Sequence, residues 1–189
     1  MHLFKTLIAF TALATSPIVT ALNVTEIQDL YWVYHGGQWP NILGGYTGKF
    51  NEMQYIAKGF KTPGNVRTEA PKLLSTIELF LQQAASDSSK IRASPKVTSE
   101  EASKKIRQRY NWFLGAEVAF FTILKEKKIL VNGTEYQANI LSRLGALGAF
   151  TNQSISDLDT ILVPLKGTGP VKEFEKSYNE VVQVYNAAT

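Results

Sequence analysis

Tyr110-Asn111-Trp112-Phe113-Leu114-Gly115-Ala116-Glu117-Val118-Ala119-Phe120-Phe121-Thr122-Ile123-Leu124 places apolar side chains on almost every side of a helix. A helix on the surface of a globular protein needs only one apolar stripe, whereas a helix that is apolar all round must be enclosed by others or face a nonpolar partner. We therefore expect this segment to be the central helix of a bundle.

Both ends of this helix are marked in the sequence. Thr98 is in position to be the N-cap, and Glu101, three residues later, would complete a capping box. No proline follows before the Asn132-Gly133 turn. The pattern predicts one helix from Thr98 to about Leu130, which would be about 45 Å long at 1.5 Å per residue.

Apolar residues at helical spacing predict three helices ahead of the central one. The first runs from Val24 to Tyr34, and a short one covers residues 50–60 and is closed by a turn at Thr62-Pro63-Gly64-Asn65. A long amphipathic helix from Thr68 to Arg92 follows, with apolar residues in alternating steps of four and three. It ends at Ala93-Ser94-Pro95, so we expect it to be the antiparallel neighbour of the central helix.

Further apolar stripes predict the helices after the Asn132-Gly133 turn. One covers residues 140–148, and a shorter one covers 155–162 and stops at Pro164. The last helix begins near Pro170, a typical first-turn residue, and ends near Tyr185. Because apolar alternation never persists, the chain is predicted to be all-α, an antiparallel helical bundle of about five main helices plus short helices.

The segment from Gly36 to Gly48 stands out by holding five of the chain's thirteen glycines together with Trp39 and Tyr46. It combines a permissive backbone with large rings. Two interpretations stay open: a mobile flap over a pocket, or an ordinary loop whose rings are buried in the core.

Composition excludes several classes of protein. The 189-residue chain has no cysteine, so disulfides, thiolate nucleophiles and cysteine-bound metals are excluded. The net charge is +4, and the basic residues are scattered among acids, which argues against nucleic-acid binding. The length fits one domain.

No constellation of catalytic or metal-binding residues stands out. His35 is the only histidine beyond residue 21, and a histidine at a helix end more often interacts with the helix dipole than catalyses. The pairs Glu100-Glu101 and Asp157 with Asp159 are predicted in first turns of helices, where carboxylates stabilise the dipole. We therefore expect no enzyme activity, no cofactor and no metal.

The N-terminus has the organisation of a secretory signal. Lys5 precedes a short apolar run from Thr6 to Ala14, and Val19-Thr20-Ala21 forms a small-residue cleavage site. Residues 1–21 are therefore predicted to be a signal peptide, and residues 22–189 a secreted, single helical-bundle domain. The apolar run is too short to be a transmembrane segment, and no hydrophobic tail indicates a C-terminal lipid anchor.

Three glycosylation sequons agree with secretion, at Asn23, Asn132 and Asn152. All three fall at predicted helix boundaries, where a glycan does not interfere with packing. Whether each site is occupied is left open.

The order of these elements resembles a known family. The pattern consists of Thr-Ser-Glu-Glu-Ala at 98–102, Leu-Lys-Glu-Lys-Lys at 124–128, a Leu-rich helix, Val163-Pro164, and Val-Val-Gln-Val-Tyr at 181–185. It is similar to the fungal hydrophobic surface binding protein A and cell-wall (galacto)mannoprotein family, over roughly Ile27 to Tyr185, without a specific motif. The resemblance implies a secreted helical chain that adheres to hydrophobic surfaces or binds fatty acids inside its bundle.

A lipid tail would need apolar walls around small residues. Gly115 and Ala116 lie among the aromatics of the central helix, and they either let a neighbouring helix approach closely or leave a cavity. Glu117, in the same apolar girdle, is expected to bond to a tyrosine or to be protonated. The candidate lipid-binding residues are Phe113, Leu114, Glu117, Val118, Phe121, Leu74, Ile77, Leu81 and Tyr178. The candidate donors to a carboxylate head group are Tyr110, Arg109, Gln83 and Tyr178.

The sequence thus favours a secreted, non-enzymatic, monomeric protein of the fungal cell wall or extracellular space that binds fatty acids, other lipids or hydrophobic surfaces. Either a preformed cavity takes the lipid, or the amphipathic helices open on a hydrophobic surface. The alternative is a structural wall glycoprotein or secreted effector that acts through protein–protein contacts.

Overall fold

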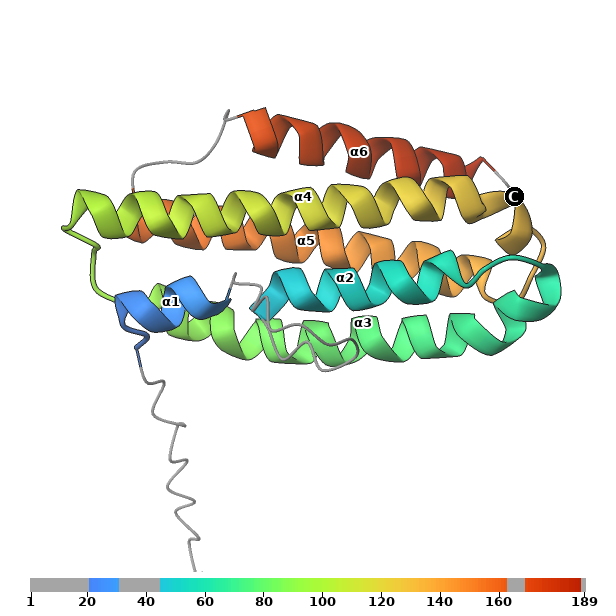
Figure 1. Ribbon diagram of the computed structural model, residues 1–189, viewed down its shortest axis with the longest axis horizontal. Coiled ribbons are helices and arrows are strands. Elements are labelled where there is room, and N and C mark those ends of the chain that lie inside the picture. The colour runs from blue at the N-terminus through green and yellow to red at the C-terminus, as the bar shows by residue number, and fades with distance from the viewer. Residues whose placement is uncertain (1–20, 31–44, 163–168, 188–189) are drawn as a thin grey trace, which may run out of the picture.

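The computed structural model describes residues 21–30, 45–162 and 169–187, and every regular element within these ranges is an α-helix. The all-α prediction is therefore confirmed (Figure 1). The remainder of the predicted first helix, together with His35 and Trp39, lies outside the described residues. The helices are α1 (Val24–Leu30), α2 (Gly45–Lys58), α3 (Pro63–Arg92), α4 (Glu100–Val131), α5 (Gln137–Ile161) and α6 (Gly169–Asn186).

The five longer helices form two layers, and neighbours within a layer run parallel (Figure 1). One layer holds α2, α4 and α6 with α4 in the middle, and the other holds α3 and α5. Ion pairs that join the C-terminal parts of two helices agree with these parallel directions. Lys125 Nζ on α4 lies 2.7 Å from Glu180 on α6, and an Arg92 nitrogen at the end of α3 lies 3.3 Å from Asp157 near the end of α5.

From α2 to α6, successive helices reverse direction along the chain, as expected of an antiparallel bundle (Figure 1). The prediction that α3 is the neighbour of α4 is nevertheless wrong, because α4 packs mainly against α2 and α6. The connection after Arg92 carries the chain from one layer to the other. It is fixed to the end of α5, where the Val97 N–H donates to the Ile161 carbonyl at 3.1 Å.

α3 and α4 begin at residues other than the predicted ones. α3 begins at Pro63, inside the segment predicted to be a turn, because the Thr62 hydroxyl accepts a hydrogen bond from the Asn65 N–H at 3.2 Å. The N-cap of α4 is Ser99 rather than Thr98, and its hydroxyl accepts from the Ala102 N–H at 3.3 Å. Local capping bonds explain both differences.

The start of α2 overlaps the predicted glycine-rich loop. Residues 45–48 form its first turn, and the Tyr46 ring is buried in the core. Residues 36–44 of that segment lie outside the described residues. The described part of the segment is therefore helical, with its ring inside the bundle.

α5 is one continuous helix where the sequence predicted two shorter ones. The polar run 151–154 suggested a break, but the side chains of Thr151 and Ser154 face the interior and are buried. Asn152 consequently lies inside a helix, on its exposed side, rather than at a boundary. Asp157 and Asp159 lie in its last turns rather than in a first turn.

The expectation that α4 is enclosed on all sides is wrong. Trp112 is 50% exposed, and Gly115 and Thr122 on the same side are exposed. As the middle helix of its layer, α4 is covered on both flanks and by the other layer, but not on its outer side. Across the described residues, none of the helices combines the length and apolar character that crossing a membrane requires.

Candidate functional site

A cluster of aromatic rings fills the space between α2, α3, α4 and α5. Most of its ring pairs meet edge to face: Phe80 and Phe150 have centroids 5.1 Å apart, and Phe50 and Phe113 have centroids 5.5 Å apart. Each such pair stabilises the core by about 0.5–1.5 kcal/mol beyond the buried area. We call this set the aromatic cluster, and its members are Tyr46, Phe50, Phe80, Phe113 and Phe150.

The rings continue from this cluster to α6. Phe120 connects to Phe50 at 5.8 Å and to Phe121 at 5.9 Å. Phe121 in turn lies 6.1 Å from Phe174 and 5.9 Å from Tyr178. The interior is thus a continuous path of aromatic rings that touches all five longer helices.

Glu117 is a fully buried acidic group on α4, and it pairs with Thr151 of α5. Both residues are 0% exposed, and the Thr151 hydroxyl lies 2.8 and 3.0 Å from the two carboxyl oxygens. Burial raises the pKa of Glu117 well above 4.5, although the bond from Thr151 acts in the opposite direction. Since a hydroxyl has one hydrogen, the two short contacts are both satisfied when the carboxyl is protonated and donates the second bond.

The partner of Glu117 is therefore a threonine rather than a tyrosine, and the raised pKa agrees with the other expectation, a protonated carboxyl. Tyr110 approaches the same place, because its hydroxyl donates to the Thr151 main-chain carbonyl at 3.4 Å. Thr151 was missed in the sequence because its run of polar neighbours suggested a break. Its spacing of four from Leu147 and from Ile155 on the apolar side of α5 was the signal that could have found it.

The predicted lipid-binding residues divide into two groups by burial. Those fully enclosed are Phe113, Leu114, Glu117, Phe121 and Ile77, and those half-buried against the core are Val118, Leu74, Leu81 and Tyr178. Phe121 and Tyr178 are brought into ring contact, and Phe113 joins the aromatic cluster. Between Leu74 and Leu81 on α3, Glu78 forms an ion pair with Arg143 of α5.

Gly115, which was expected either to let a helix approach closely or to leave a cavity, does neither. Gly115 faces solvent, and a Cβ on it would meet nothing within 4 Å. Close approach of helices occurs instead at Gly148 of α5. A Cβ there would overlap the ring of Tyr178 and would lie 2.9 Å from its phenol oxygen.

The candidate head-group donors Gln83 and Tyr110 are already engaged in hydrogen bonds. The Gln83 amide donates to Asp87 at 2.9 Å, and the same buried carboxylate accepts from the Tyr46 hydroxyl at 3.1 Å and from Lys90 at 3.3 Å. This arrangement anchors the start of α2 to α3. Tyr110 is bonded to the main-chain carbonyl of Thr151, the partner of Glu117, and the half-buried Tyr178 contacts Phe121 at 5.9 Å.

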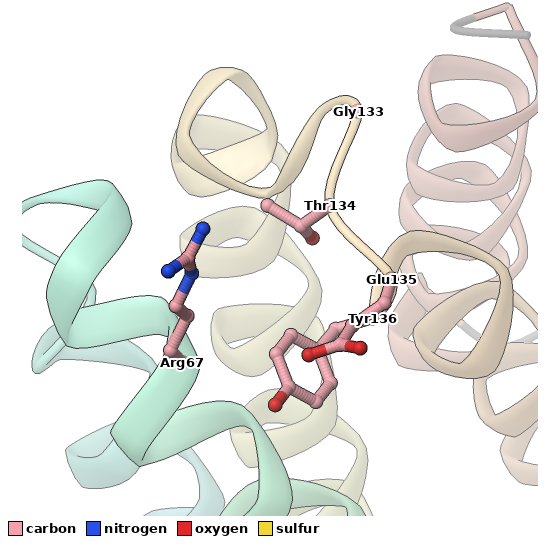
Figure 2. A pocket seen from close by; sticks show the side chains of 5 residues that line it. All are labelled: Arg67, Gly133, Thr134, Glu135 and Tyr136. Atoms are coloured by element: carbon pink, nitrogen blue, oxygen red, sulfur yellow. The ribbon is translucent and has the colours of Figure 1, made fainter.

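A separate, polar pocket of about 370 Å³ lies at the far end of the bundle, beside the α4–α5 turn. Arg67 enters it from α3, and Gly133, Thr134, Glu135 and Tyr136 form the rest of its wall (Figure 2). A bond to Glu135 raises the pKa of the Tyr136 phenol, and the charge of Arg67 lowers it. No group of three metal-ligating side chains occurs in the part of the chain that the structure describes.

Comparison with known proteins gives one match at the level of fold. No family model and no curated protein matches the chain. Among solved structures, the fold is similar to that of AfMP4p in complex with palmitic acid, with a TM-score of 0.54 and 13% identity over 76% of this chain and 94% of that one. At this identity the likeness shows the shared fold alone.

Proposed function

We propose that this protein binds a long-chain fatty acid or a similar lipid between its two helix layers, and that it is a secreted, non-enzymatic protein of the cell wall or extracellular space. The observation that supports lipid binding is the continuous aromatic path, in a fold shared with a protein whose structure holds palmitic acid. The signal-like residues 1–21 and the three sequons support secretion.

The half-buried apolar side chains at the margin of the core are where the tail would enter. Leu74, Leu81 and Phe150 pack against the core while retaining some exposure, so they can move at a lower cost than the enclosed rings. Phe150 is also a member of the aromatic cluster. Its displacement would open a path to Phe113.

The energies are sufficient without a specific polar contact. About fifteen buried tail carbons at about 0.8 kcal/mol each contribute about 12 kcal/mol. Association costs at least about 4 kcal/mol, so at most about 8 kcal/mol remains, which corresponds to micromolar affinity at best. A protonated Glu117 beside the tail carries no charge, so its presence in the path does not oppose an apolar ligand.

The test is native mass spectrometry and lipid extraction on purified residues 22–189, followed by incubation with palmitate. We expect about one fatty acid per chain and a higher melting temperature when palmitate is added. A chain that remains free of lipid after incubation would overturn the proposal. Adsorption to hydrophobic beads in that case would favour opening on a surface, and its absence would favour a protein partner.

Two tryptophan variants locate the ligand. Leu81→Trp enlarges a half-buried side chain at the core margin, and we expect it to weaken palmitate binding at least about tenfold. Leu79→Trp enlarges an exposed side chain two residues away on the same helix and should leave binding unchanged. Equal binding by both variants would place the lipid elsewhere.

A further inference from the structure

We propose that the polar pocket beside the α4–α5 turn binds the first sugar residues of a glycan attached to Asn132. This inference rests on the secretion included in the proposed function, and it is independent of lipid binding. It assigns an occupant to a pocket that lies away from the aromatic path.

The wall of the pocket is a well-fixed turn. The Gly133 N–H donates to the Gln137 side chain at 3.0 Å, and Gly133 has a φ of +70°, which glycine adopts readily. The Thr134 hydroxyl donates to the Val131 carbonyl at 2.6 Å. These bonds hold the backbone of the pocket wall in place before any ligand binds.

The side chains around the pocket suit a neutral polyhydroxylated ring. Arg67 supplies donors, Glu135 supplies acceptors, and Tyr136 presents a flat ring with a hydroxyl, all bordering one space (Figure 2). Because the positive and negative charges offset each other, the pocket does not select an ion. Its volume of about 370 Å³ is at the lower end of the range of about 300–1,000 Å³ that is typical of ligand pockets, and it suits one or two sugar rings.

The position of the sequon selects a tethered sugar over a free one. Asn132 is exposed at the C-cap of α4, and the next two sequon residues, Gly133 and Thr134, line the pocket. A small, open polar site binds a free sugar only at about millimolar concentration. A short tether supplies an effective concentration of the same order, so an attached glycan would occupy the site substantially.

The other two sequons serve as internal controls. The Asn23 side-chain oxygen, Oδ1, caps α1 by accepting a hydrogen bond from the Glu26 N–H at 3.0 Å. Attachment of a glycan at the side-chain amide nitrogen leaves that oxygen in place. Asn152 lies on the exposed side of α5. Neither residue borders the pocket, so a glycan at either position is not expected to affect the α4–α5 turn.

The experiment secretes residues 22–189 from a glycosylating yeast and measures site occupancy by mass spectrometry and hydrogen exchange in the peptide that covers residues 132–137. We expect a glycan on Asn132 and exchange at least about fivefold slower than in Asn132→Gln. Arg67→Ala should remove that protection while Asn132 stays glycosylated. Lys61→Ala, an exposed cation just ahead of α3, should retain it.

Three results would overturn the inference. A glycan on Asn132 without slower exchange would show that the pocket does not hold it. An absence of glycan on Asn132 would overturn this inference alone, because secretion from the yeast does not depend on the chain's own residues 1–21. Micromolar binding of N-acetylglucosamine disaccharide to the unglycosylated chain, followed by NMR of the Thr134 and Tyr136 amides, would assign the pocket to free saccharide instead.

Discussion

The ring of Tyr178 on α6 covers Gly148 of α5 so closely that no side chain fits between the two helices. The ring is also held from its other sides, since it stacks on Phe174 at 6.0 Å and touches Phe121 at 5.9 Å. α6 can pack this closely on α5 because residue 148 is a glycine, which has no side chain.

Gly148→Ala is expected to destabilise the fold by about 1–3 kcal/mol, because the added methyl group must displace the Tyr178 ring. Gly145 lies one turn earlier in α5, and a Cβ there meets nothing within 4 Å. Gly145→Ala should therefore stabilise by about 0.5–1 kcal/mol through helix propensity. Urea unfolding measures both, and changes of the same sign would contradict the packing described.

Glu117→Gln is expected to stabilise the protein at neutral pH. Burial raises the pKa of Glu117 in the folded state above 4.5, so its contribution to stability is fully present below about pH 4.5 and is lost as the pH rises through the folded-state pKa. Glutamine reproduces the hydrogen bonds of the protonated acid without a titrating group. We expect the melting temperature at pH 7 to rise by about 2–4 °C or more, a gain of about 1 kcal/mol.

The pH dependence supplies the control for that variant. The difference between wild type and Glu117→Gln should shrink as the pH falls to and below 4.5, because the wild-type carboxyl then becomes protonated in the unfolded state as well. A difference that is constant between pH 4 and pH 8 would exclude titration of Glu117 as the cause.

Thr151→Val should destabilise by about 1–3 kcal/mol, because it leaves the buried Glu117 carboxyl without its partner. Thr151→Ser retains the hydroxyl and should cost less than Thr151→Val. In the double variant Glu117→Leu with Thr151→Val both polar groups are absent, and the loss from Thr151→Val should be largely recovered. Thermal unfolding of the wild type, Glu117→Leu, Thr151→Val and the double variant measures this coupling.

Arg92→Ala should cost about 1–2 kcal/mol, because Asp157 is 2% exposed and would retain only the Gln153 bond at 2.7 Å. The cost is below that of a fully buried pair because the Arg92 side chain is 47% exposed. Lys104→Ala removes the exposed ion pair with Glu100 and should change stability by about 0.5 kcal/mol or less. Equal losses of stability in Arg92→Ala and Lys104→Ala would show that burial of Asp157 does not strengthen its ion pair.

Ser94→Ala tests the predicted start of the mature chain. The Leu22 nitrogen donates to the Ser94 hydroxyl at 2.9 Å, and that hydroxyl donates to the Lys90 carbonyl at 2.8 Å, at the C-terminal end of α3. A free ammonium at Leu22 would gain about 0.3–1 kcal/mol from the helix dipole. Ser94→Ala should therefore destabilise a chain that begins at Leu22 more than one with residues before it, as measured by thermal unfolding.

The helices themselves could be predicted because their signals are local. The long run without proline gave α4, and the position of Pro170 gave the start of α6. The arrangement of the layers could not be predicted, since periodicity tells which side of a helix is apolar but not which helix covers it. Consecutive α3 and α4 were therefore paired, although α4 packs mainly against α2 and α6, and α3 mainly against α5.

The site was partly predictable for the same reason. Phe113 and Phe121 were identified from the apolar character of one helix, and both lie in the aromatic path. The rings that contact Phe113 come from distant segments, since Phe50 lies on α2 and Phe150 on α5. Thr151, the partner of Glu117, lies 34 residues beyond it in the sequence. Contacts of this kind depend on tertiary packing, which a single sequence does not reveal.

The parallel order within each layer determines when the chain can finish folding. Neither layer contains two helices that are consecutive in the sequence, so no layer closes as its helices emerge during synthesis. α6 is made last, and it covers Phe121 with Phe174 and donates from the Tyr185 hydroxyl to the Leu124 carbonyl at 3.2 Å. Until the 18 residues of α6 arrive, one flank of α4 stays uncovered, and a nascent chain would present that flank to chaperones.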